Sequence, residues 1–234
     1  MTPPVATDSR DQRLARYQRF VEHVQKVCAE DPGRRAALRR SLGRLPEDAG
    51  YRAHGVVARF LSETPNRAEE RAFYAVAAMI AAQPRDARDQ ERSNNGQGDT
   101  ASAEPDVASA GDGSANTTPE SETAPARRAN LGTTLAQAVP QAMAERTAEA
   151  RLHLLARQGL DGCHRNLPAI VRLLRGRQIQ LDWVQLLDDL VALDRHRDRV
   201  AKRWLQSFYR TLYRRSEAAT SPENPNSDNL METS

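Results

Sequence analysis

The chain has 234 residues, a mean hydropathy of −0.71 and 28% charged residues, which is the composition of a heavily solvated protein. No apolar run approaches the roughly 20 residues of a membrane span, and the N-terminus lacks the pattern of a signal peptide. Cys28 and Cys163 are far apart and outside any CxxC pair, so neither a disulfide framework nor a zinc site is indicated. We expect a cytoplasmic protein without cofactor or metal.

The overall charge of +3 hides an uneven distribution along the chain. Residues 1–83 carry +4 and residues 129–215 carry +7, whereas residues 84–128 and 216–234 carry −4 each. Of the 34 basic residues only Lys26 and Lys202 are lysines. Arginine binds phosphate through a planar fork of donors, so the excess suits nucleic acid. A GC-rich genome would also produce it.

Residues 8–83 read as an N-terminal helical domain. Apolar residues recur at helical spacing over residues 8–30, and Asp31-Pro32 has the pattern of a second helix start, with Gly43 ending that helix. The run 54–61 is apolar enough to be buried. Asn66 with Glu69 forms a capping box for a further helix that stops before Pro84.

The second of these helices is unusually rich in arginine and contains no acidic residue. Leu38 and Leu42 define its buried side, and arginine stems can lie along such a side with their guanidinium groups facing outward. The helix is either a solvated surface or a phosphate-binding face, and we favour phosphate contact. The arginines concerned are Arg34, Arg35, Arg39, Arg40 and Arg44.

Residues 84–128 are rich in Asp, Ser, Asn, Gly and Pro, with Val107 as the only large apolar side chain. Such a segment cannot bury enough surface to offset its conformational entropy, so we expect a disordered linker between two helical halves. The acidic tail 216–234 is also expected to be disordered.

Residues 129–215 read as a C-terminal helical bundle that restarts at Asn130. Pro140 either breaks or begins a helix that runs to about Gln158, and Arg151 lies in the middle of the apolar arc of that helix. A buried unpaired charge is very unfavourable, so Arg151 needs a partner. That partner is either an internal carboxylate, Asp188 or Asp189, or a phosphate in a groove between helices.

The next helix has Pro168 in its predicted first turn and ends at Gly176. Arg172 and Arg175 are expected on its outer face, which Arg177 extends. The segment 182–194 follows, apolar on almost every side, so it belongs in the middle of a bundle.

Asp182 and Gln185 have the pattern of a capping box at the start of this central helix. A mixed charge run then predicts a turn, and a last helix covers about residues 199–215. Few aromatic residues are free to stack on bases; Tyr209 and Tyr213 are the exceptions.

No catalytic constellation is present. The five histidines are scattered, and the chain contains no HExxH, Gly-rich phosphate loop or GxSxG turn. Asp188 and Asp189 are adjacent on one helix and point about 100° apart, so they are not a catalytic pair. We therefore do not expect an enzyme.

Several stretches carry a family likeness through their order and spacing: RAALRRSLG (35–43), FYAVAAMIAA (73–82), NLGTTL (130–135), ARLHLLARQ (150–158), IVRLLRGRQIQLDWVQLLDDLVALD (170–194) and VAKRWLQSFY (200–209). Together they resemble the CasB family, the small subunit of the type I-E CRISPR surveillance complex Cascade. The resemblance implies an all-α protein of two small bundles, present in two copies along the belly of the complex. It further implies a non-catalytic scaffold that contacts crRNA, target DNA and the backbone and large subunits, and stabilises the displaced strand of the R-loop.

Two hypotheses remain open at this point. In the first, the arginine faces bind nucleic acid inside the complex, through contacts that do not read sequence. In the second, the protein is a helical adaptor whose basic faces contact acidic partner subunits.

Overall fold

The computed structural model describes residues 6–96 and 128–220, and every regular element among them is helical. The predicted all-α class is therefore confirmed. Two short 3-10 turns, η1 (Pro46–Asp48) and η2 (Ala58–Phe60), flank α3. The α-helices are α1 (Ala6–Glu30), α2 (Pro32–Arg40), α3 (Tyr51–Val57), α4 (Arg67–Ala82), α5 (Arg85–Gly96), α6 (Leu131–Ala138), α7 (Glu145–Arg157), α8 (Leu160–Gly176) and α9 (Trp183–Thr220).

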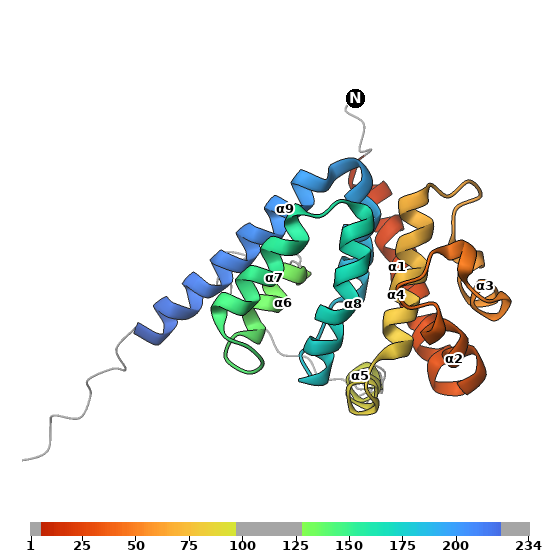
Figure 1. Cartoon of the computed structure of the whole chain (residues 1–234), viewed down its shortest axis with the longest axis horizontal. Coiled ribbons are helices and arrows are strands. Elements are labelled where there is room, and N and C mark those ends of the chain that lie inside the picture. Colours follow the sequence, from red (N-terminus) through yellow and green to blue (C-terminus); the bar gives the residue numbers. More distant parts are fainter. Residues whose placement is uncertain (1–5, 97–127, 221–234) are drawn as a thin grey trace, which may run out of the picture.

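Helix α9 is the element that the other helices share. All residues from Trp183 to Leu190 are buried, as the apolar circumference of this segment predicts. Helices α1, α4 and α8 pack against α9, and so do α6 and α7 (Figure 1). The predicted turn after the central helix is a kink at His196 (φ −134°, ψ 34°) inside one helical element. The helix also continues to Thr220, beyond its predicted end.

Side-chain caps start the helices where the sequence places them. Asp31 Oδ1 accepts a hydrogen bond from the Arg34 amide (2.9 Å), and Asn66 Oδ1 accepts one from the Glu69 amide (2.9 Å). Asn130 does the same for α6. Asp182 accepts from the Gln185 amide (2.9 Å), but the Gln185 side chain donates onward to Asp189, so only half of the predicted capping box forms.

The two prolines of the C-terminal half differ in how well they were predicted. Of the alternatives for Pro140, the break is the correct one, because Pro140 follows α6 and α7 begins only at Glu145. The first-turn prediction for Pro168 is wrong. Pro168 lies in the middle of α8, eight residues after Leu160, rather than in a first turn. An internal proline removes one backbone hydrogen bond. Burial of Cys163 and Leu167 in the core continues the helix through this break.

The segment predicted as linker, 84–128, is not wholly without structure, because its first part forms α5. Few apolar side chains of α5 are available for burial, so its composition gave no sign of a packed helix. Residues 97–127 and the tail from 221 lie outside the described residues. Where the chain resumes, Arg128 forms an ion pair with Asp182 just before α9 (3.2 Å).

The two halves of the chain share one hydrophobic core in the described residues. Helices α1 and α4 from the first half pack directly on α9, and α4 also contacts α8. The division into domains at 8–83 and 129–215 stays a prediction. Among helices of the part that the structure describes, none is long and apolar enough to cross a membrane.

Candidate nucleic-acid interface

Many arginines are already paired within the protein, which narrows the set available to an outside ligand. Glu69, Asp188 and Asp189 each hold one arginine near the core, and the exposed Asp161 holds two. A guanidinium held by a buried carboxylate is costly to remove from it. The pairs are Arg13–Asp188, Arg16–Glu69, Arg67–Asp161, Arg71–Asp161 and Arg203–Asp189.

The arginines of α2 and the turn after it are different. Arg39, Arg40 and Arg44 are exposed, and none has a side-chain hydrogen bond or ion pair to another residue within 6–96 or 128–220. Arg35 is half-buried near the Cys28 thiol, whose pKa burial raises to about 11 while Arg35 opposes the rise. Arg34 forms an exposed ion pair with Asp31 (3.3 Å), a contact of little strength in water.

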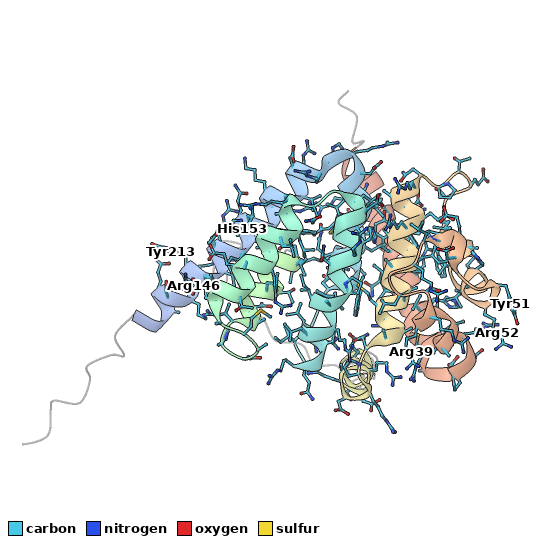
Figure 2. All side chains as sticks on the ribbon, viewed as in Figure 1. Arg39, Tyr51, Arg52, Arg146, His153 and Tyr213 are labelled. Atoms are coloured by element: carbon cyan, nitrogen blue, oxygen red, sulfur yellow. The ribbon has the colours of Figure 1, made fainter. Side chains whose placement is uncertain are left out.

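The structure adds two residues to this face that sequence reasoning missed. Tyr51 at the start of α3 is 78% exposed, and the Arg52 guanidinium lies 5.8 Å from the centre of its ring. Arg52 Nε also donates to the Tyr51 hydroxyl (3.2 Å). Figure 2 shows Arg39, Tyr51 and Arg52 at the same end of the molecule. The signal available in the sequence was an aromatic residue, Tyr51, directly before an arginine. The apolar run 54–61 that follows dominates the local pattern and hid this signal.

The three arginines predicted on α8 do not form one face. Arg172 and Arg177 are exposed and have no side-chain partner among the described residues. Arg175 is only 1% exposed, so its assignment as a nucleic-acid contact was wrong. Its guanidinium donates to Gln83 Oε1 (2.6 Å) and to the carbonyl oxygens of Ile179 and Ala87 (both 2.8 Å).

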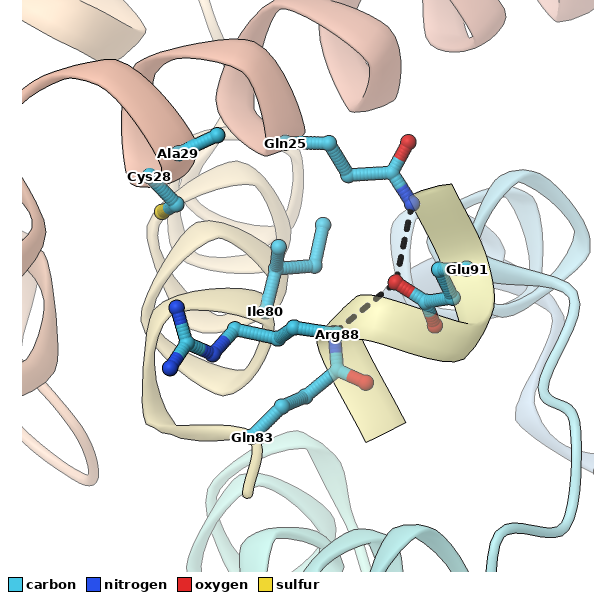
Figure 3. A pocket seen from close by; sticks show the side chains of 7 residues that line it. All are labelled: Gln25, Cys28, Ala29, Ile80, Gln83, Arg88 and Glu91. Carbon is cyan, nitrogen blue, oxygen red and sulfur yellow. Dashed lines mark hydrogen bonds between the residues drawn. The ribbon is translucent and has the colours of Figure 1, made fainter. Parts of the chain in front are cut away.

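Arg175 completes a polar cluster that fixes α5 against the core. It forms an ion pair with Glu91 (2.9 Å). The Glu91 carboxylate also accepts hydrogen bonds from Trp183 Nε1 and from the side-chain amides of Gln25 and Gln83. Figure 3 shows the last two of these bonds beside a small cavity of about 40 Å³ between α1, α4 and α5. Burial lowers the pKa of Arg175 and Glu91 opposes that change. This pairing explains why an arginine lies in the interior.

Arg151 on α7 is half-buried, and no ion pair or side-chain hydrogen bond satisfies it within the described residues. The prediction that an internal carboxylate, Asp188 or Asp189, pairs with Arg151 is wrong. Asp188 pairs with Arg13 and Asp189 pairs with Arg203. Asp189 also accepts hydrogen bonds from Gln185 and Trp204. The other alternative, a phosphate, stays a prediction.

The predicted site residues therefore fall on separate surfaces. The α2 arginines share one end of the molecule with Arg52, whereas α7 and its Arg151 lie beyond α8, on the other side of α4 (Figures 1 and 2). Arg172 and Arg177 lie at the end of α8 that Arg175 ties to α5. Among residues 6–96 and 128–220, no group of three His, Cys, Asp or Glu side chains is placed to hold a metal. The arrangement suits several backbone contacts on an extended polyanion.

A family model described as CRISPR-associated protein Cse2 matches residues 34–209, most of the chain. The chain belongs to the Cse2 family. The resemblance recognised in the sequence is thereby confirmed. A comparison with curated proteins finds no match to this Cse2-family chain.

Solved structures similar to this Cse2-family chain include subunits of whole complexes. A chain of a CRISPR RNA-guided surveillance complex is 38% identical, with a TM-score of 0.69, and the match covers 88% of this chain and 99% of that one. A chain of such a complex in a pre-nicking state is 40% identical, with a TM-score of 0.71 and coverages of 88% and 98%. M. ruber CasB is 23% identical, with a TM-score of 0.63 and the same coverages of 88% and 98%, and it supports the fold alone.

Proposed function

We propose that this Cse2-family protein is the non-catalytic small subunit of a type I-E CRISPR surveillance complex, Cascade, in the cytoplasm. There it binds nucleic-acid backbone and stabilises the crRNA-guided R-loop. Its partners are crRNA, the target DNA with its displaced strand, the backbone and large subunits, and a second copy of itself. The observation that carries the proposal is the group of exposed arginines on and after α2, Arg39, Arg40 and Arg44, that no protein side chain satisfies in the described residues.

Exposed arginines are enough for this role because the energy required is small. Forming an R-loop exchanges a DNA duplex for an RNA–DNA duplex of similar stability, so a few backbone contacts can tip the balance. A guanidinium fork binds two phosphate oxygens at once and recognises no base. Separate patches on α2, α7 and α8 support several such contacts along one strand.

The test separates DNA binding from assembly. Replacing Arg39, Arg40 and Arg172 by alanine removes three exposed arginines without side-chain partners in the described structure. We expect the complex to assemble normally on size exclusion and to bind target DNA more weakly. If each arginine neutralises one phosphate of a single strand, the slope of log affinity against log salt becomes shallower by roughly 2.

A control with the same loss of charge replaces Arg67, Arg85 and Arg197, which are also exposed but paired with Asp161, Asp89 and Asp198. This variant should retain most of its affinity. Equal losses of affinity for target DNA in both variants would show that the effect comes from the overall charge alone. Failure of the first variant to assemble would instead support the adaptor hypothesis, in which these arginines contact acidic subunits.

A further inference from the structure

The last part of α9 is a second basic surface, far from α2. From Arg199 to Ser216 the helix carries six basic side chains and no acidic one. Val200, Trp204 and Phe208 face the core, where α6 and α7 cover them. The end of α9 extends past α6 and α7, so its outer side has no covering helix (Figure 1).

Two tyrosines one helical turn apart are exposed on this part of α9, and the first of them lies beside α7. Tyr209 is 43% exposed and Tyr213 is 65% exposed. Together with Arg210 and Arg214, which are also exposed, they line a shallow hollow. Figure 2 shows Tyr213 near Arg146 and His153, at the end opposite Tyr51. We call these four residues of α9 the tyrosine patch.

One of the two rings is held in place and the other is free. The Tyr209 hydroxyl donates to Glu149 Oε1 (2.6 Å) and lies 3.0 Å from His153 Nε2, and its ring packs edge-on against Phe208. The Tyr213 hydroxyl has no partner within the described residues. Two acids lie near the patch: Glu149 is engaged by Tyr209 and by His153 at 3.8 Å, and the exposed Glu217 follows Tyr213 by one helical turn. The patch therefore presents the free ring of Tyr213 next to the anchored ring of Tyr209, with Arg210 and Arg214 beside them.

An aromatic ring between cations fits one class of ligand better than others. Each nucleotide of a single strand offers a phosphate for an arginine and a flat base for a ring, and stacking accepts every base. In a duplex the base faces are hidden, so the ring would gain nothing. A second copy docking by its α2 end would bring arginines against arginines, which charge repulsion disfavours.

We propose that the tyrosine patch is a base-stacking site for single-stranded nucleic acid, with Tyr213 as the stacking ring and Arg210 and Arg214 as phosphate contacts. The inference rests on the proposed function, since it presumes that a strand reaches the protein. It adds a contact of a different kind, because Tyr213 would bind a base whereas Arg39, Arg40 and Arg44 bind only the backbone.

The experiment compares two labelled strands of equal length and phosphate count, oligothymidine and an abasic oligomer, titrated with the full-length protein. We expect the protein to prefer oligothymidine. Tyr213→Ala should lower the affinity for oligothymidine by between roughly five-fold and a hundred-fold and leave the abasic strand unaffected. Tyr213→Phe keeps the ring and should keep the preference. Because Tyr213 is mostly exposed, these substitutions should not disturb folding.

Equal affinity for the two strands, or a preference that survives Tyr213→Ala, would overturn the stacking site. The proposed function would still stand if both strands bound in a salt-dependent way and the α2 substitutions weakened them. Sedimentation of the free protein tests whether the patch is instead a contact between two copies. If Tyr213→Ala abolishes a dimer and leaves the strand preference unchanged, the patch is such a contact and the stacking site is wrong.

Discussion

Glu91 on α5 and Arg175 on α8 form an ion pair 2.9 Å long across two helices, with Arg175 only 1% exposed. The sequence offers no local hint of this pair, yet it joins α5 to the core and removes one arginine from the outer surface. Loss of the pair should therefore affect the stability of the protein rather than its binding of a ligand.

Replacing Arg175 by methionine should lower the free energy of unfolding by roughly 3–5 kcal/mol. The substitution leaves Glu91 without its ion-pair partner and frees three hydrogen-bond acceptors in the interior. Arg172→Met on the exposed side of the same helix is the matched control and should change stability by less than about 0.5 kcal/mol. Urea denaturation measures both; equal effects would contradict the buried role of Arg175.

Replacing Gly132 by alanine should destabilise the contact of α6 with α9. A Cβ atom at residue 132 would lie within 2 Å of the Trp204 carbonyl oxygen, so the helices must move apart. We expect a loss of roughly 1–3 kcal/mol or more. Gly55 lies inside α3, and a Cβ atom added there would have nothing within 4 Å, so Gly55→Ala should instead stabilise by roughly 0.5–1 kcal/mol. Thermal unfolding of the two variants should shift in opposite directions.

Both tryptophans should be poorly accessible to acrylamide in the native protein. Trp183 is 4% exposed and Trp204 is fully buried. Replacing Glu91 by alanine removes the acceptor of the Trp183 indole N–H and loosens α5, so fluorescence quenching should increase. Glu91→Gln keeps an oxygen acceptor, so acrylamide should quench its tryptophan fluorescence less than that of the alanine variant. Ready quenching of the unmodified protein would show that the core around α9 is not formed.

The contribution of His164 to stability should fall as the pH is lowered from about 6.5 to about 4. This side chain is 4% exposed and neither ring nitrogen has a partner in the described structure. Burial, reinforced by Arg71, lowers the pKa of His164 to about 4. Between those pH values the unfolded chain binds a proton that the folded protein does not, so unfolding becomes easier as pH falls.

Comparison with a His164→Leu variant isolates this effect. The difference in unfolding free energy between the two proteins should change by up to roughly 3 kcal/mol from pH 6.5 to pH 4. Burial raises the pKa of Asp189 to about 6, which acts in the opposite direction over pH 4–6. Asp189 is present in both proteins, so its contribution cancels in the difference. A difference that does not vary with pH would show that folding does not lower the pKa of His164.

Features set by neighbouring residues could be predicted from the sequence. Asp31 and Asn66 cap helices as expected, because a cap joins residues three positions apart. The burial of α9 followed from its apolar circumference. The exposure of Arg39 and Arg40 followed from their place on a short amphipathic helix.

Features that depend on distant residues could not be predicted. Arg175 and Gln83 are 92 positions apart, and helical spacing alone placed Arg175 on the outer face with Arg172. Helix α5 lacks an apolar stripe of its own and is held by polar contacts from α8 and α9. The helix through Pro168 likewise depends on the core around it, which overrides a local preference.

The described residues on either side of the segment 97–127 are fixed close to one another. On one side Glu91 of α5 bonds to Trp183 (3.0 Å), and on the other Arg128 pairs with Asp182, the residue before it. Each doubling of the length of a connection between two such fixed points costs only about 0.6 kcal/mol in closure entropy. A reporter domain spliced in here should therefore leave the surrounding framework undisturbed.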